Sequence, residues 1–270
     1  GPYHFEKSES KLRRSIAAKI FGLCYSKLNL RNVVVVCPSH YTKDKITNSK
    51  NIKVKEVTFI PNAVMPSDKV CPVELLSGFP LSRNLVLISA NWDDPRKGLN
   101  TFLTFLDKVA SLEQKVWTVH LIGNIRKLER FEKFSSRLRI VKYGFLNREK
   151  SCEIMTSCEY LVCPSLEDNS PNVITEAFSH GRAVLAQCGS GADSYVTPSV
   201  GCLFDFKNCS KGNVESFLQF YYSNDPLLLG KYSKERANNE YSPGKIGQLY
   251  TELYLSYLYP YDSKTQRESI

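Results

Sequence analysis

The stretch of residues 160–186, YLVCPSLEDNSPNVITEAFSHGRAVLA, predicts the fold of this chain. It begins with the apolar run Tyr160–Cys163, continues through a polar turn and ends with the apolar run Ala183–Ala186. Between the two runs, apolar residues recur at helical spacing over Val173–Phe178, and Gly181 can end that helix. Because parallel strands need a crossover connection, usually a helix, the stretch predicts a strand–helix–strand unit of a parallel sheet.

The polar turn before this helix carries residue types that suit a ligand site. Ser170 can cap the helix, and Pro171 suits its first position, which needs no backbone N–H. Asp168 precedes the helix and Glu176 lies in its second turn, with seven residues between them. Since helical side chains tilt toward the N-terminus, Glu176 leans back toward Asp168, and the helix N-terminus between them favours a phosphate. These features predict a nucleotide-sugar pocket; the alternative is a capped surface helix with two solvated acids.

Residues 164–186, PSLEDNSPNVITEAFSHGRAVLA, resemble the donor-binding signature of retaining glycosyltransferases of family four, which have the GT-B fold. In that family an acid, seven intervening residues and a glutamate contact the donor nucleotide sugar. The resemblance covers about residues 32–254, and it implies that Asp168 holds sugar hydroxyls while Glu176 holds ribose hydroxyls. The family usually has a glutamate where this chain has Asp168, which shortens that side chain by one methylene.

A second turn, DDPRKG at residues 93–98, is similar to the donor-phosphate turn of the same family. Lys97 follows a predicted strand, where an ammonium group can meet a diphosphate, and it matches the lysine of the family. The family has an arginine a few residues before this lysine, and this chain has Asn91 at that position. One of the cations that would stabilise the leaving group is therefore absent. Arg96 could compensate, although as the neighbour of Lys97 it is expected to point elsewhere.

The resemblance implies transfer of a sugar, with retention, from a nucleoside diphosphate donor. Lys97 and Asp168 are then the predicted catalytic residues, and the backbone N–H groups at the helix start stabilise the charge on the diphosphate. No metal or other cofactor is expected, because the family is metal-independent and the chain has no D-x-D pair. The residues predicted to bind the donor are Asn91, Arg96, Tyr143, Gly144, Phe145, Asn169, Ser170, Asn172, Val173 and Glu176, of which Tyr143, Gly144 and Phe145 line the base.

Strand-like and helix-like segments alternate along the chain, which predicts an α/β fold with a Rossmann-like, doubly wound parallel sheet. The resemblance identifies this sheet as the GT-B C-terminal domain, at residues 76–235. Residues 1–75 would be a remnant of the N-terminal acceptor domain and a linker, and residues 236–270 a helix that crosses back to brace it, with a tail. Most of the first domain is missing, so the sequence is expected to be a fragment or the product of a truncated gene.

Composition restricts the partners and the compartment. A formal charge of +9 favours phosphorylated ligands or an anionic membrane face, and the absence of a nucleic-acid motif argues against DNA or RNA. No apolar run is long enough to span a membrane and no signal peptide is evident, which predicts a cytoplasmic protein, with contact at the inner membrane face as an option. The resemblance implies a glycan or lipid-linked acceptor of surface-polysaccharide type. The nine cysteines contain no CxxC pair and are expected to be reduced core residues.

Two other function classes remain open. A non-catalytic nucleotide-sugar or partner-binding module is favoured by the missing acceptor domain and by the departures from the family at Asn91, Asp168 and Ser194. An NAD-type oxidoreductase is disfavoured, because the pair Gly189 and Gly191 lacks the third glycine of a dinucleotide fingerprint. Donor turnover by the chain alone would distinguish an enzyme from a binding module.

Overall fold

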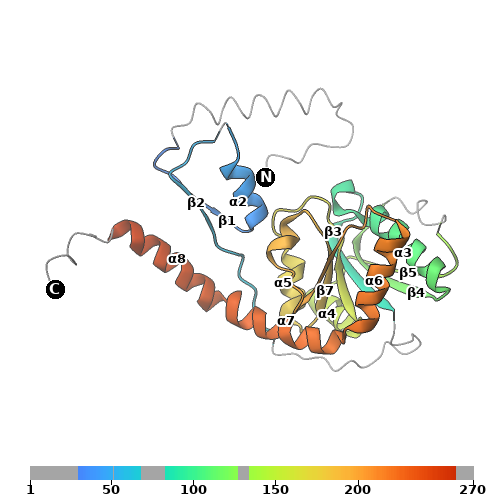
Figure 1. Cartoon of the computed structure of the whole chain (residues 1–270). Helices are drawn as coiled ribbons and strands as arrows, with labels where there is room; N and C mark the ends of the chain where they lie inside the picture. The colour runs from blue at the N-terminus through green and yellow to red at the C-terminus, as the bar shows by residue number, and fades with distance from the viewer. Residues whose placement is uncertain (1–29, 51, 68–82, 127–133, 260–270) are drawn as a thin grey trace.

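The structure is a computed structural model that describes residues 30–50, 52–67, 83–126 and 134–259. In this part of the chain a six-stranded sheet flanked by helices is joined to a smaller unit of two strands and one helix (Figure 1). The first 29 residues of the expected N-terminal remnant, and the domain boundary expected at residue 75, lie outside the described residues.

The large sheet has the strand order β5-β4-β3-β6-β7-β8, and all neighbouring strands are parallel. The order therefore reverses between β3 and β6, and ligands of doubly wound sheets bind beyond the carboxyl ends of the strands at such a point. This arrangement confirms the predicted doubly wound α/β fold. The strands are β3 (Asn84–Asn91), β4 (Trp117–Asn124), β5 (Leu138–Gly144), β6 (Tyr160–Cys163), β7 (Ala183–Gln187) and β8 (Gly201–Phe204).

Helices cover both faces of this sheet. One face packs against α3 (Leu99–Glu113) and α6 (Lys211–Ser223), and the other packs against α4 (Arg148–Ser157), α5 (Asn172–Ser179) and α7 (Pro226–Glu240). Because both faces are covered, strands such as β6 and β7 are buried at every position instead of alternating between buried and exposed residues. The unit quoted first in the sequence, β6-α5-β7, therefore lies in the middle of the domain.

Helix α7 was missed in the sequence because its buried face is small. Its buried residues include Gly230, Ser233 and Ala237, which give little apolar periodicity. Gly230 approaches the turn after α5 so closely that an added Cβ would lie 2.2 Å from the carbonyl oxygen of Gly181. Close backbone packing, and not large side chains, joins α7 to α5.

The smaller unit consists of β1 (Val34–Cys37), α2 (His40–Thr47) and β2 (Glu56–Phe59), with β1 and β2 parallel. We call residues 30–67, as far as they are described, the N-terminal unit. Helix α8 (Pro243–Leu258) leaves the large sheet and runs back to this unit (Figure 1). The hydroxyl of Tyr257 donates to the Glu56 carboxylate, and the Lys55 ammonium lies 4.4 Å from the centroid of the Tyr257 ring.

The predicted boundary at residue 235 falls inside the continuous helix α7. The chain instead breaks at Tyr241, because Ser242 caps α8 by accepting a hydrogen bond from the backbone N–H of Lys245, and Pro243 begins the helix. No helix in the described part of the chain is long and apolar enough to cross a membrane. The cysteines of the described ranges, including the buried Cys37 and Cys163, are free thiols.

Candidate functional site

The turn after β3 is held against the turn after β6 by the backbone. Asp94 accepts the N–H of Arg96 at 2.9 Å and so caps the 3₁₀ helix η1 (Pro95–Lys97). Gly98 follows in the left-handed region, with φ +68°, and a Cβ added there would lie 1.9 Å from the carbonyl oxygen of Pro164. This close approach requires glycine. It sets Lys97 directly opposite the residues that follow β6.

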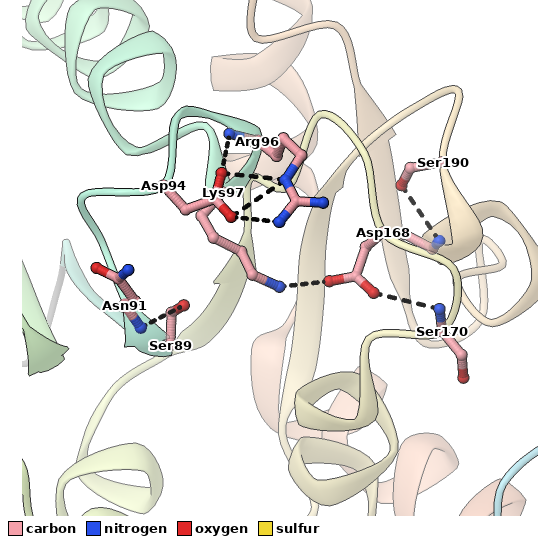
Figure 2. A network of polar contacts seen from close by, with 9 residues as sticks. Ser89, Asn91, Asp94, Arg96, Lys97, Asp168, Ser170 and Ser190 are labelled. Atoms are coloured by element: carbon pink, nitrogen blue, oxygen red, sulfur yellow. Dashed lines mark hydrogen bonds and ion pairs between the residues drawn. The ribbon is translucent and has the colours of Figure 1, made fainter. Parts of the chain in front are cut away.

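Lys97 and Asp168 form an ion pair across the point where the strand order reverses. The Lys97 Nζ lies 2.6 Å from Asp168 Oδ2, and the two side chains are only 33% and 17% exposed (Figure 2). The other carboxylate oxygen of Asp168 accepts the backbone N–H of Ser170 at 3.2 Å. Charge-assisted hydrogen bonds of this kind are about twice as strong as neutral ones, so the pair fixes both side chains.

The backbone of Asp168 is held from the other side by Gly191. The N–H of Gly191 donates to the Asp168 carbonyl at 2.8 Å, and an added Cβ at Gly191 would lie 2.3 Å from the carbonyl oxygen of Asn169. The glycine pair after β7, predicted to be a plain turn and not a dinucleotide fingerprint, therefore supports the loop that carries Asp168.

Helix α5 begins beside this ion pair, at Asn172. Its N-cap is Pro171, and no side chain caps it. The prediction that Ser170 caps the helix is wrong, because Pro171 occupies the N-cap position; the Ser170 hydroxyl is instead hydrogen-bonded to the phenol of Tyr195 at 2.7 Å. The first N–H groups of a helix have no partner within the helix, so those of Asn172 and Val173 remain available to an anion.

Glu176 lies in the second turn of α5 with an exposed side chain. Partial desolvation raises the pKa of Glu176, while electrostatic interactions with Arg148 and His180 lower it. Among the described residues, no hydrogen bond or ion pair joins this carboxylate to Lys97 or Asp168. His180 occupies the C-cap of α5, where its Nδ1 lies 2.8 Å from the Glu176 carbonyl oxygen.

Two of the predicted donor-binding residues are engaged in the turn after β3. The Arg96 guanidinium binds the Asp94 carboxylate, with Nη2 at 2.6 Å and Nε at 3.1 Å, and it holds the pKa of Asp94 below its usual range. Asn91 accepts the N–H of Asp93 at 3.0 Å through its side-chain oxygen. Figure 2 shows the Arg96 guanidinium turned to Asp94, whereas the Lys97 ammonium reaches Asp168.

The residues predicted to line the base follow β5. Gly144 has φ +67°, and the Phe145 side chain is 71% exposed. Tyr143 is anchored below them, because its hydroxyl lies 2.8 Å from Nδ1 of His120, whose Nε2 lies 3.2 Å from the side-chain oxygen of Asn84. His120 is fully buried and hydrogen-bonded through both ring nitrogens.

We expect His120 to make the unfolding free energy pH-dependent. Burial lowers its pKa from 6.5 to about 4, with a smaller contribution from Arg139. The unfolded chain therefore binds the proton more tightly, and the stabilisation that is present above pH 6.5 is lost as the pH falls toward 4. The loss is about 3 kcal/mol, from 1.36 kcal/mol per pKa unit. Denaturant unfolding of the wild type and His120→Gln between pH 4 and 7.5 measures it, and identical slopes in the two proteins would contradict the assignment.

Sequence reasoning missed Asn62 and Tyr195. The Asn62 amide nitrogen donates to the side-chain oxygens of Asn172 at 2.8 Å and Ser170 at 3.3 Å. Both residues reach the candidate site only through the fold, since Asn62 is more than a hundred residues away in sequence. No local pattern marks either of them.

A sequence model of the family "Glycosyl transferases group 1" matches residues 83–220, just over half of the 270 residues. The chain belongs to this family. The matched range contains the Lys97–Asp168 pair and the whole of α5. Group 1 membership and the parallel sheet together confirm the predicted Rossmann-like domain. No curated protein matches this group 1 chain by sequence.

Solved structures show the same fold. They include sucrose-phosphate synthase from Thermosynechococcus elongatus, with 18% identity and a TM-score of 0.67 over 94% of this chain and 64% of that one. HepE from Anabaena, in a complex with UDP and glucose, has 14% identity and a TM-score of 0.66 over 95% and 69%. WaaG, a glycosyltransferase involved in lipopolysaccharide biosynthesis, has 15% identity and a TM-score of 0.60 over 79% and 60%. This group 1 chain therefore has a GT-B-type fold and spans roughly two thirds of such proteins.

Proposed function

We propose that this chain binds the nucleoside-diphosphate-sugar donor of a glycosyltransferase that transfers the sugar with retention. The observation that carries the proposal is the Lys97–Asp168 ion pair, 2.6 Å long, beside the N-terminus of α5 where the strand order reverses. A lysine ammonium has three N–H donors. One N–H donor of Lys97 can stay with Asp168 while the other two bind phosphate oxygens. The ion pair can therefore bind the sugar through Asp168 and the diphosphate through Lys97.

In this reaction the anomeric C–O bond breaks and its electron pair goes to the diphosphate oxygen. Lys97 and the N–H groups of Asn172 and Val173 stabilise the negative charge that develops there. The acceptor oxygen bonds the anomeric carbon on the face that the diphosphate leaves, which retains the configuration, and the departing oxygen can take the acceptor proton. Asp168 holds hydroxyls of the sugar.

The nucleoside part of the donor lies along α5 and the end of β5. Glu176 accepts hydrogen bonds from the ribose hydroxyls, and the base rests against Tyr143, Gly144 and the exposed ring of Phe145. The reaction as proposed needs no metal or cofactor, because the cation and the helix N-terminus supply the positive charge. In the described ranges no group of three metal-ligating side chains occurs.

For the acceptor, the proposal names only a chemical class. We propose a glycan or a lipid-linked glycan, in the cytoplasm and near the inner membrane face. The involvement of WaaG in lipopolysaccharide biosynthesis supports this class, and the formal charge of +9 favours contact with anionic lipids.

Calorimetry with UDP and with GDP, titrated separately, tests the donor site. We expect the wild type to bind one of them and Glu176→Gln to bind about tenfold more weakly, because the amide loses a charge-assisted hydrogen bond to ribose. Since desolvation raises the pKa of Glu176, lowering the pH protonates the carboxylate and weakens wild-type binding, whereas Glu176→Gln stays flat. A wild type that binds neither nucleotide, or equal binding by both proteins at every pH, contradicts the proposal.

A second candidate is a non-catalytic nucleotide-sugar or partner-binding module. It is favoured by the engagement of Arg96 with Asp94 and by Asn91, which together leave fewer cations for the leaving group than the resembled family has. Nucleoside diphosphate released from a nucleotide sugar, above the level of Glu176→Ala, would exclude it. Nucleotide binding without release would favour it.

A further inference from the structure

A chain of side-chain hydrogen bonds joins the N-terminal unit to the donor loop. Tyr195, which is 1% exposed, donates its hydroxyl proton to the carbonyl oxygen of Pro38 at 2.5 Å. Since a phenol has one proton, the 2.7 Å contact between Tyr195 and Ser170 must be a bond in which Ser170 donates. The Ser170 oxygen in turn accepts an N–H of Asn62 at 3.3 Å.

This series of hydrogen bonds begins and ends in the N-terminal unit. Pro38 follows β1 and Asn62 follows β2, whereas Ser170 and Tyr195 belong to the large domain. We call the set Pro38, Asn62, Ser170 and Tyr195 the junction. Hydrogen bonds that run in one direction polarise one another, so the loss of one weakens the rest.

The junction is connected directly to the proposed donor-binding groups. The backbone N–H of Ser170 donates to Asp168 Oδ1 at 3.2 Å, while Asp168 Oδ2 binds Lys97. The second N–H of the Asn62 amide donates to the side-chain oxygen of Asn172, the first residue of α5, at 2.8 Å. The N-terminal unit therefore contacts Ser170, which binds the carboxylate of Asp168, and Asn172, which begins the helix proposed to bind phosphate.

Tyr195 is fixed more firmly on the side of the large domain. Its carbonyl oxygen accepts the Arg236 guanidinium at 2.6 Å, and its ring lies 5.7 Å from that of Tyr241, centroid to centroid. Removing the phenolic oxygen would leave this packing in place. It would deprive Pro38 of its donor and Ser170 of its acceptor.

We propose that Tyr195 and Asn62 are positioning residues that make donor binding and docking of the N-terminal unit depend on each other. The inference rests on the proposed donor site and adds to it a coupling between that site and the unit expected to belong to the acceptor side. Coupling of this kind is reciprocal: if docking of the unit orders the donor loop, bound donor must strengthen the docking by the same factor.

The test compares the whole chain with Tyr195→Phe, Asn62→Ala and Ser194→Ala. Ser194 is the matched control, because its hydroxyl accepts the N–H of His40 at 2.9 Å and so joins the same two parts outside the junction. Calorimetry with UDP and with GDP gives the affinity. Hydrogen exchange of the amides of residues 34–47, with and without nucleotide, reports docking.

We expect Tyr195→Phe to weaken nucleotide binding about tenfold, as the loss of buried hydrogen bonds predicts. We also expect it to abolish the slowing of exchange in residues 34–47 that nucleotide causes in the wild type. Asn62→Ala, at an exposed site, also weakens nucleotide binding and reduces the slowing of exchange that nucleotide causes. It replaces Tyr195→Phe in the test if that variant fails to fold. Ser194→Ala changes both clearly less than Tyr195→Phe does, because its contact with His40 does not reach the donor loop.

Unchanged affinity and unchanged protection in Tyr195→Phe would overturn the inference, as would equal effects of Ser194→Ala. If the wild type binds neither nucleotide, the proposed function fails instead, and the ligand-free proteins decide about the junction. Faster exchange of the amides of residues 168–174 in Tyr195→Phe than in Ser194→Ala then supports the positioning role, and equal exchange overturns it.

Discussion

Lys97→Ala is expected to reduce release of nucleoside diphosphate from a nucleotide sugar by roughly 10²–10³-fold, the effect of removing one preorganised donor from a developing oxyanion. The ammonium is the side-chain cation that meets Asp168, since Arg96 is bound to Asp94. Its charge acts in a partly buried setting, where water screens it less than at the surface. Steady-state turnover of the nucleotide sugar measures the effect. Calorimetry measures how much of it is a loss of affinity for the nucleotide.

Two further variants separate charge from positioning. Lys97→Gln can keep a hydrogen bond to Asp168 without the positive charge, so it should be nearly as impaired as Lys97→Ala. Lys115→Ala removes an ammonium that binds Glu113 at 3.0 Å at another place, and it should behave as the wild type. Turnover of Lys97→Ala within twofold of the wild type would show that Lys97 does not stabilise the leaving group.

Gly98→Ala should destabilise the protein by roughly 3–4 kcal/mol, because a strained φ and a backbone clash act together. Gly98 has φ +68°, and the added Cβ would lie 1.9 Å from the Pro164 carbonyl oxygen, which cannot rotate away as a side chain can. Relief requires the turns after β3 and β6 to separate. That movement also takes Lys97 from Asp168, so turnover should fall in any Gly98→Ala protein that remains folded.

Denaturant unfolding followed by far-UV circular dichroism measures the change in stability. Gly212→Ala is the matched control, because Gly212 lies in α6 with no atom within 4 Å of an added Cβ. Alanine favours the helix there, so this variant should equal or exceed the wild type by up to about 1 kcal/mol. A Gly98→Ala protein as stable as the wild type would mean that the two turns do not touch as described.

Local sequence was sufficient for the sheet and for the residues at its carboxyl edge. The apolar runs of β6 and β7 and the turn residues between them follow from burial and backbone preference, which act within a few residues. Parallel strands then place the turns after β3 and β6 at one edge, so Lys97 and Asp168 could be predicted to approach each other. The distance of 2.6 Å between Lys97 Nζ and Asp168 Oδ2 agrees with that expectation.

Local sequence was misleading where a distant partner competed for the same atom. Ser170 was expected to cap α5, yet the helix begins one residue later with Pro171 at its N-cap, and the Ser170 hydroxyl contacts Tyr195, 25 residues later. Helix α7 has little apolar periodicity because its contact with α5 is a glycine-to-backbone approach. Residue 235, where a domain boundary was expected, lies inside α7, which continues to Glu240.

The amino-acid sequence by itself determined most of the strands and helices and the parallel sheet, because these depend on short-range preferences and on which residues are apolar, and its motifs marked Asp168 and Lys97 as the candidate acid and lysine. Tertiary structure alone decided how the candidate site is held: Gly98 against Pro164, Gly191 against Asn169, and Tyr195 between Pro38 and Ser170. Such contacts join residues that are distant in sequence, and whether they form depends on the simultaneous placement of several elements, which no single stretch encodes.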